Sequence, residues 1–220
     1  MSKREKGYLD QLLLSQLAPD DGGEFIQLNA GDEKEELKDE DIPADISILP
    51  IRNTVLFPGV VLPITVGRNK SIKLVKKAYK GDRIIGVVSQ KNNKVEEPSK
   101  EDLYNVGTIA HIIKMIVLPD GNTTIIIQGK KRFEIEEFTS EEPYFTAKIK
   151  VLKDVFTGKN KKEQKALIGS LKDAASKILS LSPEIPQEAQ IAIDNINDSG
   201  FLTHFLSSNL NAEVSDKQKL

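Results

Sequence analysis

The amino-acid sequence predicts an α+β protein in which an antiparallel, barrel-like β lobe is followed by a helical lobe. From Ile46 to about Asp154, apolar and polar residues mostly alternate, which is the spacing of strands with one buried face. After Asp154 the apolar residues recur every three to four positions, which is the spacing of helices. We therefore divide the 220 residues into a leader (1–45), a β lobe (46–154) and a helical lobe (155–220).

The leader is strongly acidic. Residues 1–45 carry 13 acidic and 5 basic side chains, a balance of −8, whereas residues 46–220 carry 20 and 26, a balance of +6. Such a segment, poor in aromatic residues, buries too little apolar area to offset the entropy lost on ordering. We expect it to be largely disordered and to act as a solvating tail or, alternatively, as an autoinhibitory or pseudo-substrate segment.

The β lobe begins with two apolar runs that each carry a proline, ILPIRNTVLFPG at 48–59 and VVLPITVGR at 60–68. Because proline has no backbone N–H, such strands belong at sheet edges or bulges. One helix then interrupts the strands, from Asn69 to Lys80, and Gly81 ends it. Its apolar residues fill one arc and its lysines fill the opposite arc, so the helix is amphipathic.

A long hairpin is predicted later in the lobe. Two apolar runs, 109–118 and 123–127, flank a Pro-Asp-Gly-Asn turn in which Gly121 takes the left-handed position. Gly107 and Gly129 stand where bulges or tight corners are expected. Several antiparallel strands with bulges predict a small, partly open barrel.

The helical lobe reads as three helices and the start of a fourth. A stripe of apolar residues from Leu167 to Leu179 predicts the first helix, and the Ser-Pro pair at 182–183 ends it. The later helices are expected to start near Pro186, Ser199 and Ser215. We therefore expect the helical lobe to be truncated at its C-terminal end, Leu220.

No catalytic signature is found in the sequence. There is no cysteine, which excludes disulfides and thiolate metal sites, and the two histidines, His111 and His204, are too far apart to suggest a metal site or a catalytic triad. Phosphate-loop and nucleophile-elbow patterns are missing as well. No apolar run approaches the roughly 20 residues of a membrane span. We expect a cytoplasmic, non-catalytic chain with no metal and no cofactor.

With no catalytic signature, binding is the function class that the sequence favours. Apolar side chains on faces that should meet water suggest a groove for unfolded chain segments, with five candidates: Phe57, Val60, Val61, Ile116 and Leu118. Two lysines of the 69–80 helix, Lys70 and Lys73, would steer acidic or polar segments. The alternatives are that these apolar faces pack on the helices and that the lysines form a solvated face. Nucleic acid is disfavoured as a partner, because the chain has no tryptophan and its other aromatic residues stand at core-like spacings.

Several short motifs, in order, are similar to those of one family. They comprise the opening at 48–68 (with Ile51 where leucine is commoner), GRNKSI at 67–72 (with Asn69 in place of glutamate), YNVGTIA at 104–110, LPDG at 118–121, QG at 128–129 with Arg132, and the segments 209–210 and 216–220. Together they resemble the amino-terminal domain of the Lon family of ATP-dependent proteases over residues 46–220. The acidic leader has no counterpart in shorter relatives.

The resemblance implies a PUA-like pseudo-barrel followed by a helical bundle. It implies a domain that captures unfolded or tagged proteins and supports a homohexamer, for a parent protease that degrades misfolded and selected regulatory proteins. The ATPase, which uses ATP and magnesium, and the serine–lysine peptidase would lie outside this chain. Arg52 and Arg132, together with Gly107 and Gly121, are expected to be structural. The rival interpretations are a stand-alone Lon-like adaptor and a PUA-like RNA-binding module.

Overall fold

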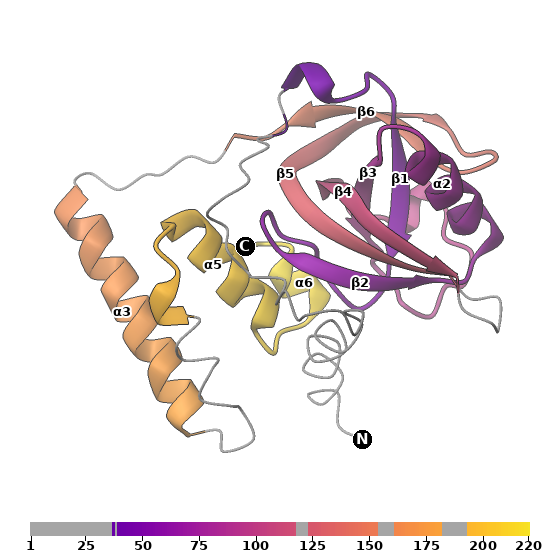
Figure 1. Ribbon diagram of the computed structural model, residues 1–220. Helices are drawn as coiled ribbons and strands as arrows, with labels where there is room; N and C mark the ends of the chain where they lie inside the picture. The colour runs from indigo at the N-terminus through magenta and orange to yellow at the C-terminus, as the bar shows by residue number, and fades with distance from the viewer. Residues whose placement is uncertain (1–36, 38, 118–122, 154–160, 182–192) are drawn as a thin grey trace, which may run out of the picture.

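The computed structural model describes residues 37, 39–117, 123–153, 161–181 and 193–220. Figure 1 shows a strongly curved sheet with α2 on one side and the C-terminal helices grouped beyond its other side. The elements are β1 (Ile46–Ile51), β2 (Val61–Val66), α2 (Asn69–Lys80), β3 (Ile84–Ser89), β4 (Val106–Val117), β5 (Thr123–Ser140), β6 (Thr146–Val151), α3 (Lys161–Ser180), α5 (Ser199–Asn209) and α6 (Val214–Lys217), with short 3-10 turns at Asp39–Asp41 and Lys100–Asp102. The predicted α+β class is confirmed.

The sheet closes on itself through the long strand β5. The strand order is β2-β5-β4-β3-β1-β6, and a further pairing of β5 with β6 completes a ring of five strands. β5 pairs with β2 through Thr123–Gln128 and with β6 through Phe133–Ser140. The first part of β5 therefore holds the edge strand β2, and the second part closes the ring. One pair of strands departs from the expected antiparallel arrangement: β1 and β3 run parallel. They can do so because the connection between them contains β2 and α2, which provides the long crossover that parallel strands require.

A β-bulge in β4 reverses the side-chain alternation that the sequence predicted for this strand. The register slips between Ile112 and Lys114, so Ile113 is an extra residue and is 43% exposed. Beyond the slip, Met115 packs on the same core as Ile112, although the two are an odd number of residues apart. An unbroken period of two had put them on opposite faces, and one inserted residue moves all later side chains to the other face.

Helix α2 lies on the barrel through the face that the sequence predicted. Leu74 and Val75 are fully buried in the main core, and Ile72, Ala78 and Tyr79 pack against that core. Gly81 is the C-cap, as predicted. A second core, centred on the fully buried Phe133, fills the part of the barrel nearer β6.

The C-terminal helices begin at residues other than the predicted caps. The Asp198 side chain, not that of Ser199, caps α5 by accepting a hydrogen bond of 2.7 Å from the Phe201 N–H. Glu213 occupies the N-cap position of α6, and Ser215 lies inside that short helix. Aspartate and serine are comparable caps, so the sequence alone could not choose between neighbours. The predicted helix end at 182–183 and start at Pro186 lie outside the described residues.

Loss of the α5 cap gives the first testable prediction. Asp198→Ala leaves the Phe201 N–H without its acceptor and should lower the free energy of unfolding by about 1 kcal/mol. Urea unfolding followed by circular dichroism measures this change. Asp198→Ser serves as the control, because serine caps almost as well and should recover most of the loss; equal losses in both variants would contradict the prediction.

Helices α5 and α6 return to the barrel and cover the turn between β1 and β2. The Phe57 ring stacks on His204 with centroids 6.2 Å apart, and Phe201 lies so close to Gly59 that a Cβ there would be 2.5 Å from its ring. Val214 packs against the small core formed by Val55, Phe57 and Val60. This contact determines which of the predicted binding residues face solvent.

Candidate functional site

Two of the five residues of the predicted apolar groove are buried in the structure. Phe57 and Val60 are 4% and 7% exposed, because α5 and α6 cover them. The expectation that both side chains lie on an accessible surface was therefore wrong, and the alternative of packing on the helices holds for them. The sequence gives no sign of this contact, because the covering residues lie about 150 positions later in the chain.

The other three apolar candidates have mixed positions. Val61 and Ile116 are half-buried, on β2 and β4. Leu118 and the predicted turn residue Gly121 lie outside the described residues. Nearby, Ile113 and Val117 of β4 are the exposed apolar side chains, at 43% and 59%. Binding of substrate by Val61, Ile116 or Leu118 stays a prediction.

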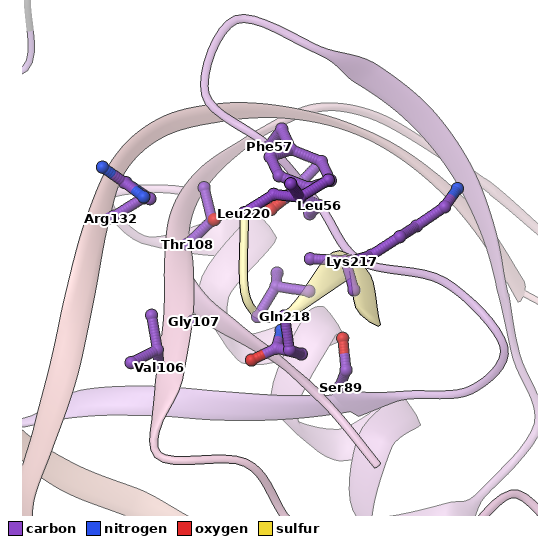
Figure 2. Close-up of a pocket in the computed structure, with 12 residues that line it drawn as sticks. Leu56, Phe57, Ser89, Val106, Gly107, Thr108, Arg132, Lys217, Gln218 and Leu220 are labelled. Carbon is purple, nitrogen blue, oxygen red and sulfur yellow. Dashed lines mark hydrogen bonds between the residues drawn. The ribbon is translucent and has the colours of Figure 1, made fainter. Parts of the chain in front are cut away.

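A cavity of about 30 Å³ remains where the C-terminal segment meets the barrel. Figure 2 shows its lining, which comes from the β1–β2 turn, from β3, β4 and β5, and from the end of the chain. Lys217 lines it and donates a 2.6 Å hydrogen bond to the Ser208 carbonyl, and burial lowers the pKa of its amine. This space holds one or two waters rather than a peptide side chain, so it is a packing gap and not a binding site.

The lysines of α2 have separate environments. Lys70 is half-buried and its amine lies 2.6 Å from the Glu142 carboxylate, which raises the pKa of the lysine. Lys73 is exposed on the outer side of the helix. Lys77 lies over the ring of Tyr144, 5.7 Å from its centroid. The predicted solvent-exposed arc of lysines is present. One of these lysines, Lys70, forms an ion pair with Glu142, which lies in the loop between β5 and β6.

The residues that were predicted to be structural contact different parts of the molecule. Arg52 is half-buried and donates to the Glu96 carbonyl at 3.1 Å, so it holds a loop rather than filling the barrel interior. Arg132 is half-buried on β5. Gly107 is buried where β4 approaches β3, and a Cβ there would lie 2.5 Å from the Val87 carbonyl oxygen. A side chain at position 107 has no room.

Several exposed large apolar side chains of the described residues lie along the α3 region, within and just after the stripe that predicted this helix. These side chains recur four, seven and three residues apart, which places them on one side of the helix. They are Leu167, Leu171 and Ile178 of α3 and Leu181, which directly follows its last residue, with exposed fractions of 61%, 38%, 60% and 75%. We call these four residues the α3 stripe.

A second apolar face of α3 points inward. Ile168, Ala175 and Leu179 pack in a cluster with Leu202 of α5, and Figure 1 shows α3 beside α5 and away from the sheet. The apolar residues of α3 thus span a wider arc than one neighbouring helix covers. Adjacent pairs such as Leu167/Ile168 and Ile178/Leu179 are the sequence signal for this excess.

The two histidines of the chain lie on different elements of the described structure. His111 lies on β4, and His204 packs on Phe57. Within residues 39–117, 123–153, 161–181 and 193–220, no three histidine, aspartate or glutamate side chains come together as metal ligands. None of the helices in that part of the chain combines the length and apolar character of a membrane span.

Comparison with known sequences gives one consistent result. Residues 45–220 match the family model described as the ATP-dependent protease La (LON) substrate-binding domain. A Lon protease of Cytophaga hutchinsonii is 62% identical over 197 residues, which cover 90% of this chain and 24% of that protein. A Lon protease of Flavobacterium johnsoniae is 48% identical over 220 residues, which cover 100% and 27%. The chain therefore spans about a quarter of the length of these relatives.

A solved structure has a similar fold. It is the N-terminal domain of a Mycobacterium avium complex Lon protease, which superposes with a TM-score of 0.59 over 80% of this chain and 87% of that one. Only 18% of the aligned residues are identical, so this likeness concerns the fold alone.

Proposed function

Because the chain belongs to the family of Lon substrate-binding domains, we propose that it binds unfolded or tagged protein chains and presents them to a Lon-type protease. In this proposal the chain is the non-catalytic receptor of a larger ATP-dependent serine endopeptidase. The ATPase, with ATP and magnesium, and the serine–lysine peptidase belong to the parent protein, which we place in the cytoplasm. This chain itself needs no cofactor.

The observation that carries the proposal is the α3 stripe. Four large aliphatic side chains, three on one face of α3 and one directly after it, are exposed to solvent, whereas monomeric soluble proteins normally cover such contiguous apolar surface. Unfolded proteins expose the same kind of side chain, so this face recognises the loss of structure rather than one sequence. We assign apolar capture to the α3 stripe in place of Phe57 and Val60, which are buried.

Weak binding suits this role. A site with a Kd of about 1 mM contributes only about 4 kcal/mol, so it releases the chain readily to a motor. In a homohexamer, which we propose for the parent protein, several copies hold one substrate and raise the overall avidity by about 10² to 10⁴ without a tighter pocket. Each copy of the domain then needs no deep groove.

Removing the apolar character of the α3 stripe tests the proposal. The double variant Leu171→Ser/Ile178→Ser should weaken binding of an unfolded, thiol-blocked model protein about tenfold or more, because both side chains lose the apolar area that the substrate would cover. Fluorescence anisotropy of the labelled model protein measures the affinity. Since both positions face solvent, circular dichroism should show an unchanged fold.

Leu210→Ser is the matched control. Leu210 is 48% exposed and loses the same kind of side chain, but it lies at the end of α5, outside the α3 stripe. Its affinity should match that of the unsubstituted chain. Equal affinities for the double variant and the unsubstituted chain would remove α3 as the binding face.

A further inference from the structure

The positive charge of the part of the chain that follows the leader is concentrated on one helix. Residues 46–220 carry 26 basic and 20 acidic side chains, a balance of +6. Helix α2 alone carries five lysines and no acidic residue, so the rest of that range has a balance of only +1. The charge of α2 is therefore not offset by acidic neighbours three or four residues away on the same helix.

Four of these lysines form one exposed face of α2. They recur at spacings of three, one and three residues, which places them on one side of the helix, opposite the buried Leu74 and Val75. All four are exposed: Lys73, Lys76, Lys77 and Lys80. We call these four residues the α2 lysine face.

Three residues of the α2 lysine face have no carboxylate partner in the described part of the chain. The fifth lysine of the helix, Lys70, is paired with Glu142 at 2.6 Å. No ion pair within the described residues includes Lys73, Lys76 or Lys80. Like charges three or four residues apart on a helix repel each other, so an acidic chain laid along this face would relieve that repulsion.

The opposite charge is present in the leader of the same chain. Residues 20–36 carry seven acidic side chains and one lysine, a balance of −6. The acidic side chains form two clusters, DDGGE at 20–24 and DEKEE at 32–36. We call residues 20–36 the acidic segment. Its charge is opposite in sign to that of the α2 lysine face and large enough to neutralise it.

The acidic segment is tethered within reach of α2. Leu37, which directly follows it, packs against the second core, and Phe145 of that core lines a surface recess together with Lys70 of α2. The composition predicts a disordered leader, and a disordered chain of 17 residues spans on average about 20–25 Å. The 12 residues of α2 cover only about 18 Å, so the tether is long enough for the segment to lie along the helix.

We propose that the acidic segment of the leader docks on the α2 lysine face of its own chain. One exposed ion pair is weak, but several such pairs form together here. The tether also holds the segment at an effective concentration in the millimolar range, so no tight contact is needed. Because the contact is electrostatic and exposed, it forms at low ionic strength and is lost at high ionic strength.

The docking gives the leader a role beyond that of a solvating tail. The docked segment covers Lys73, which the sequence analysis assigned to the steering of acidic or polar substrate segments. An acidic stretch of substrate would then have to displace the leader first, so the leader disfavours such stretches. This consequence rests on the proposed function, whereas the docking itself needs no substrate.

Paramagnetic broadening in NMR spectra tests the docking. The chain has no cysteine, so Ala30→Cys gives a single site for a nitroxide label within the acidic segment. At about 0.01 M salt, where the Debye length is about 30 Å, the label should broaden the amide signals of α2. At about 1 M salt, where the Debye length is about 3 Å, this broadening should fall by about threefold or more.

Neutralising the α2 lysine face should have the same effect as salt. In the triple variant Lys73→Gln/Lys76→Gln/Lys80→Gln, the broadening of α2 at low salt should fall by about threefold or more, because most of the attraction is removed. All three positions are exposed, so circular dichroism should show an unchanged fold.

The triple variant Lys153→Gln/Lys165→Gln/Lys177→Gln is the matched control. It changes the net charge by the same amount, and its three lysines are exposed but lie outside α2. Its broadening of α2 should stay within about 1.5-fold of that of the unsubstituted chain, because the α2 lysine face is intact.

Equal broadening at the two salt concentrations, or equal losses in the two triple variants, would overturn the docking. A mixture of nitroxide-labelled chain with isotope-labelled chain that carries no nitroxide should show no broadening. Broadening of α2 in that mixture would place the segment on a second copy and overturn docking within one chain. None of these measurements contains substrate, so their failure leaves the proposed function to be judged by the binding of the unfolded model protein.

Discussion

Gly107→Ala should destabilise the protein by about 3 kcal/mol or more, although it adds one methyl group. A Cβ at this position would lie 2.5 Å from the Val87 carbonyl oxygen, 2.7 Å from a Val88 methyl carbon and 2.8 Å from the Phe133 ring. The carbonyl belongs to the backbone of the neighbouring strand, so relief requires β3 and β4 to separate. Urea unfolding followed by circular dichroism measures the loss.

Alanine substitutions of two other glycines serve as comparisons for the Gly107 prediction. Gly67→Ala should change the free energy of unfolding by less than about 1 kcal/mol, because no atom lies within 4 Å of a Cβ built there. Gly86→Ala should fall between the two, since its closest neighbours are the side chains of Ile48 and Phe133, which can shift. An unfolding free energy for Gly107→Ala equal to that for Gly67→Ala would show that the two strands can part without cost.

Phe133→Ala should lower the free energy of unfolding by about 3–5 kcal/mol. Phe133 is 0% exposed at the centre of the second core, where its ring fills the space that Gly86 and Gly107 leave free of side chains. Alanine would leave a cavity that the closed ring of strands cannot easily collapse to fill. Denaturant unfolding measures the loss, and the slope of the transition should stay unchanged.

Val117→Ala is the control for the Phe133 prediction. Val117 is 59% exposed near the end of β4, so its truncation removes little buried surface and should cost less than about 0.5 kcal/mol. Similar losses for both variants would mean that the second core contributes little to the stability of the barrel.

The local sequence was sufficient to predict an element where its apolar pattern fits only one type of secondary structure. The 69–80 helix, its buried face, and its end at Gly81 follow from side-chain sorting and from the conformational freedom of glycine. The β4–β5 hairpin also follows, because two apolar runs flank strong turn residues. The Lon-like motifs in order along 46–220 identified the family, which the matches to Lon proteases confirm.

Local sequence misled where a single added residue or a distant segment decided the outcome. The bulge at Ile113 exchanged the two faces of β4 beyond that residue, and the local sequence gives no sign of a bulge there. Phe57 and Val60 looked like surface residues because their cover, α5 and α6, follows about 150 residues later. The cap of α5 moved by one residue because aspartate and serine are nearly equivalent caps.

The sequence by itself determined the α+β class, the change from strand to helix spacing, the amphipathic sorting of α2 and the resemblance to the Lon family, since each is encoded by residues near one another or by motifs in fixed order. Tertiary structure alone decided which apolar residues face solvent: it closed the β1–β2 turn under α5 and α6, and it left the α3 stripe open. The physical reason is that hydrophobicity drives burial without direction. Which apolar side chains become buried is therefore determined by how elements far apart in the chain pack together.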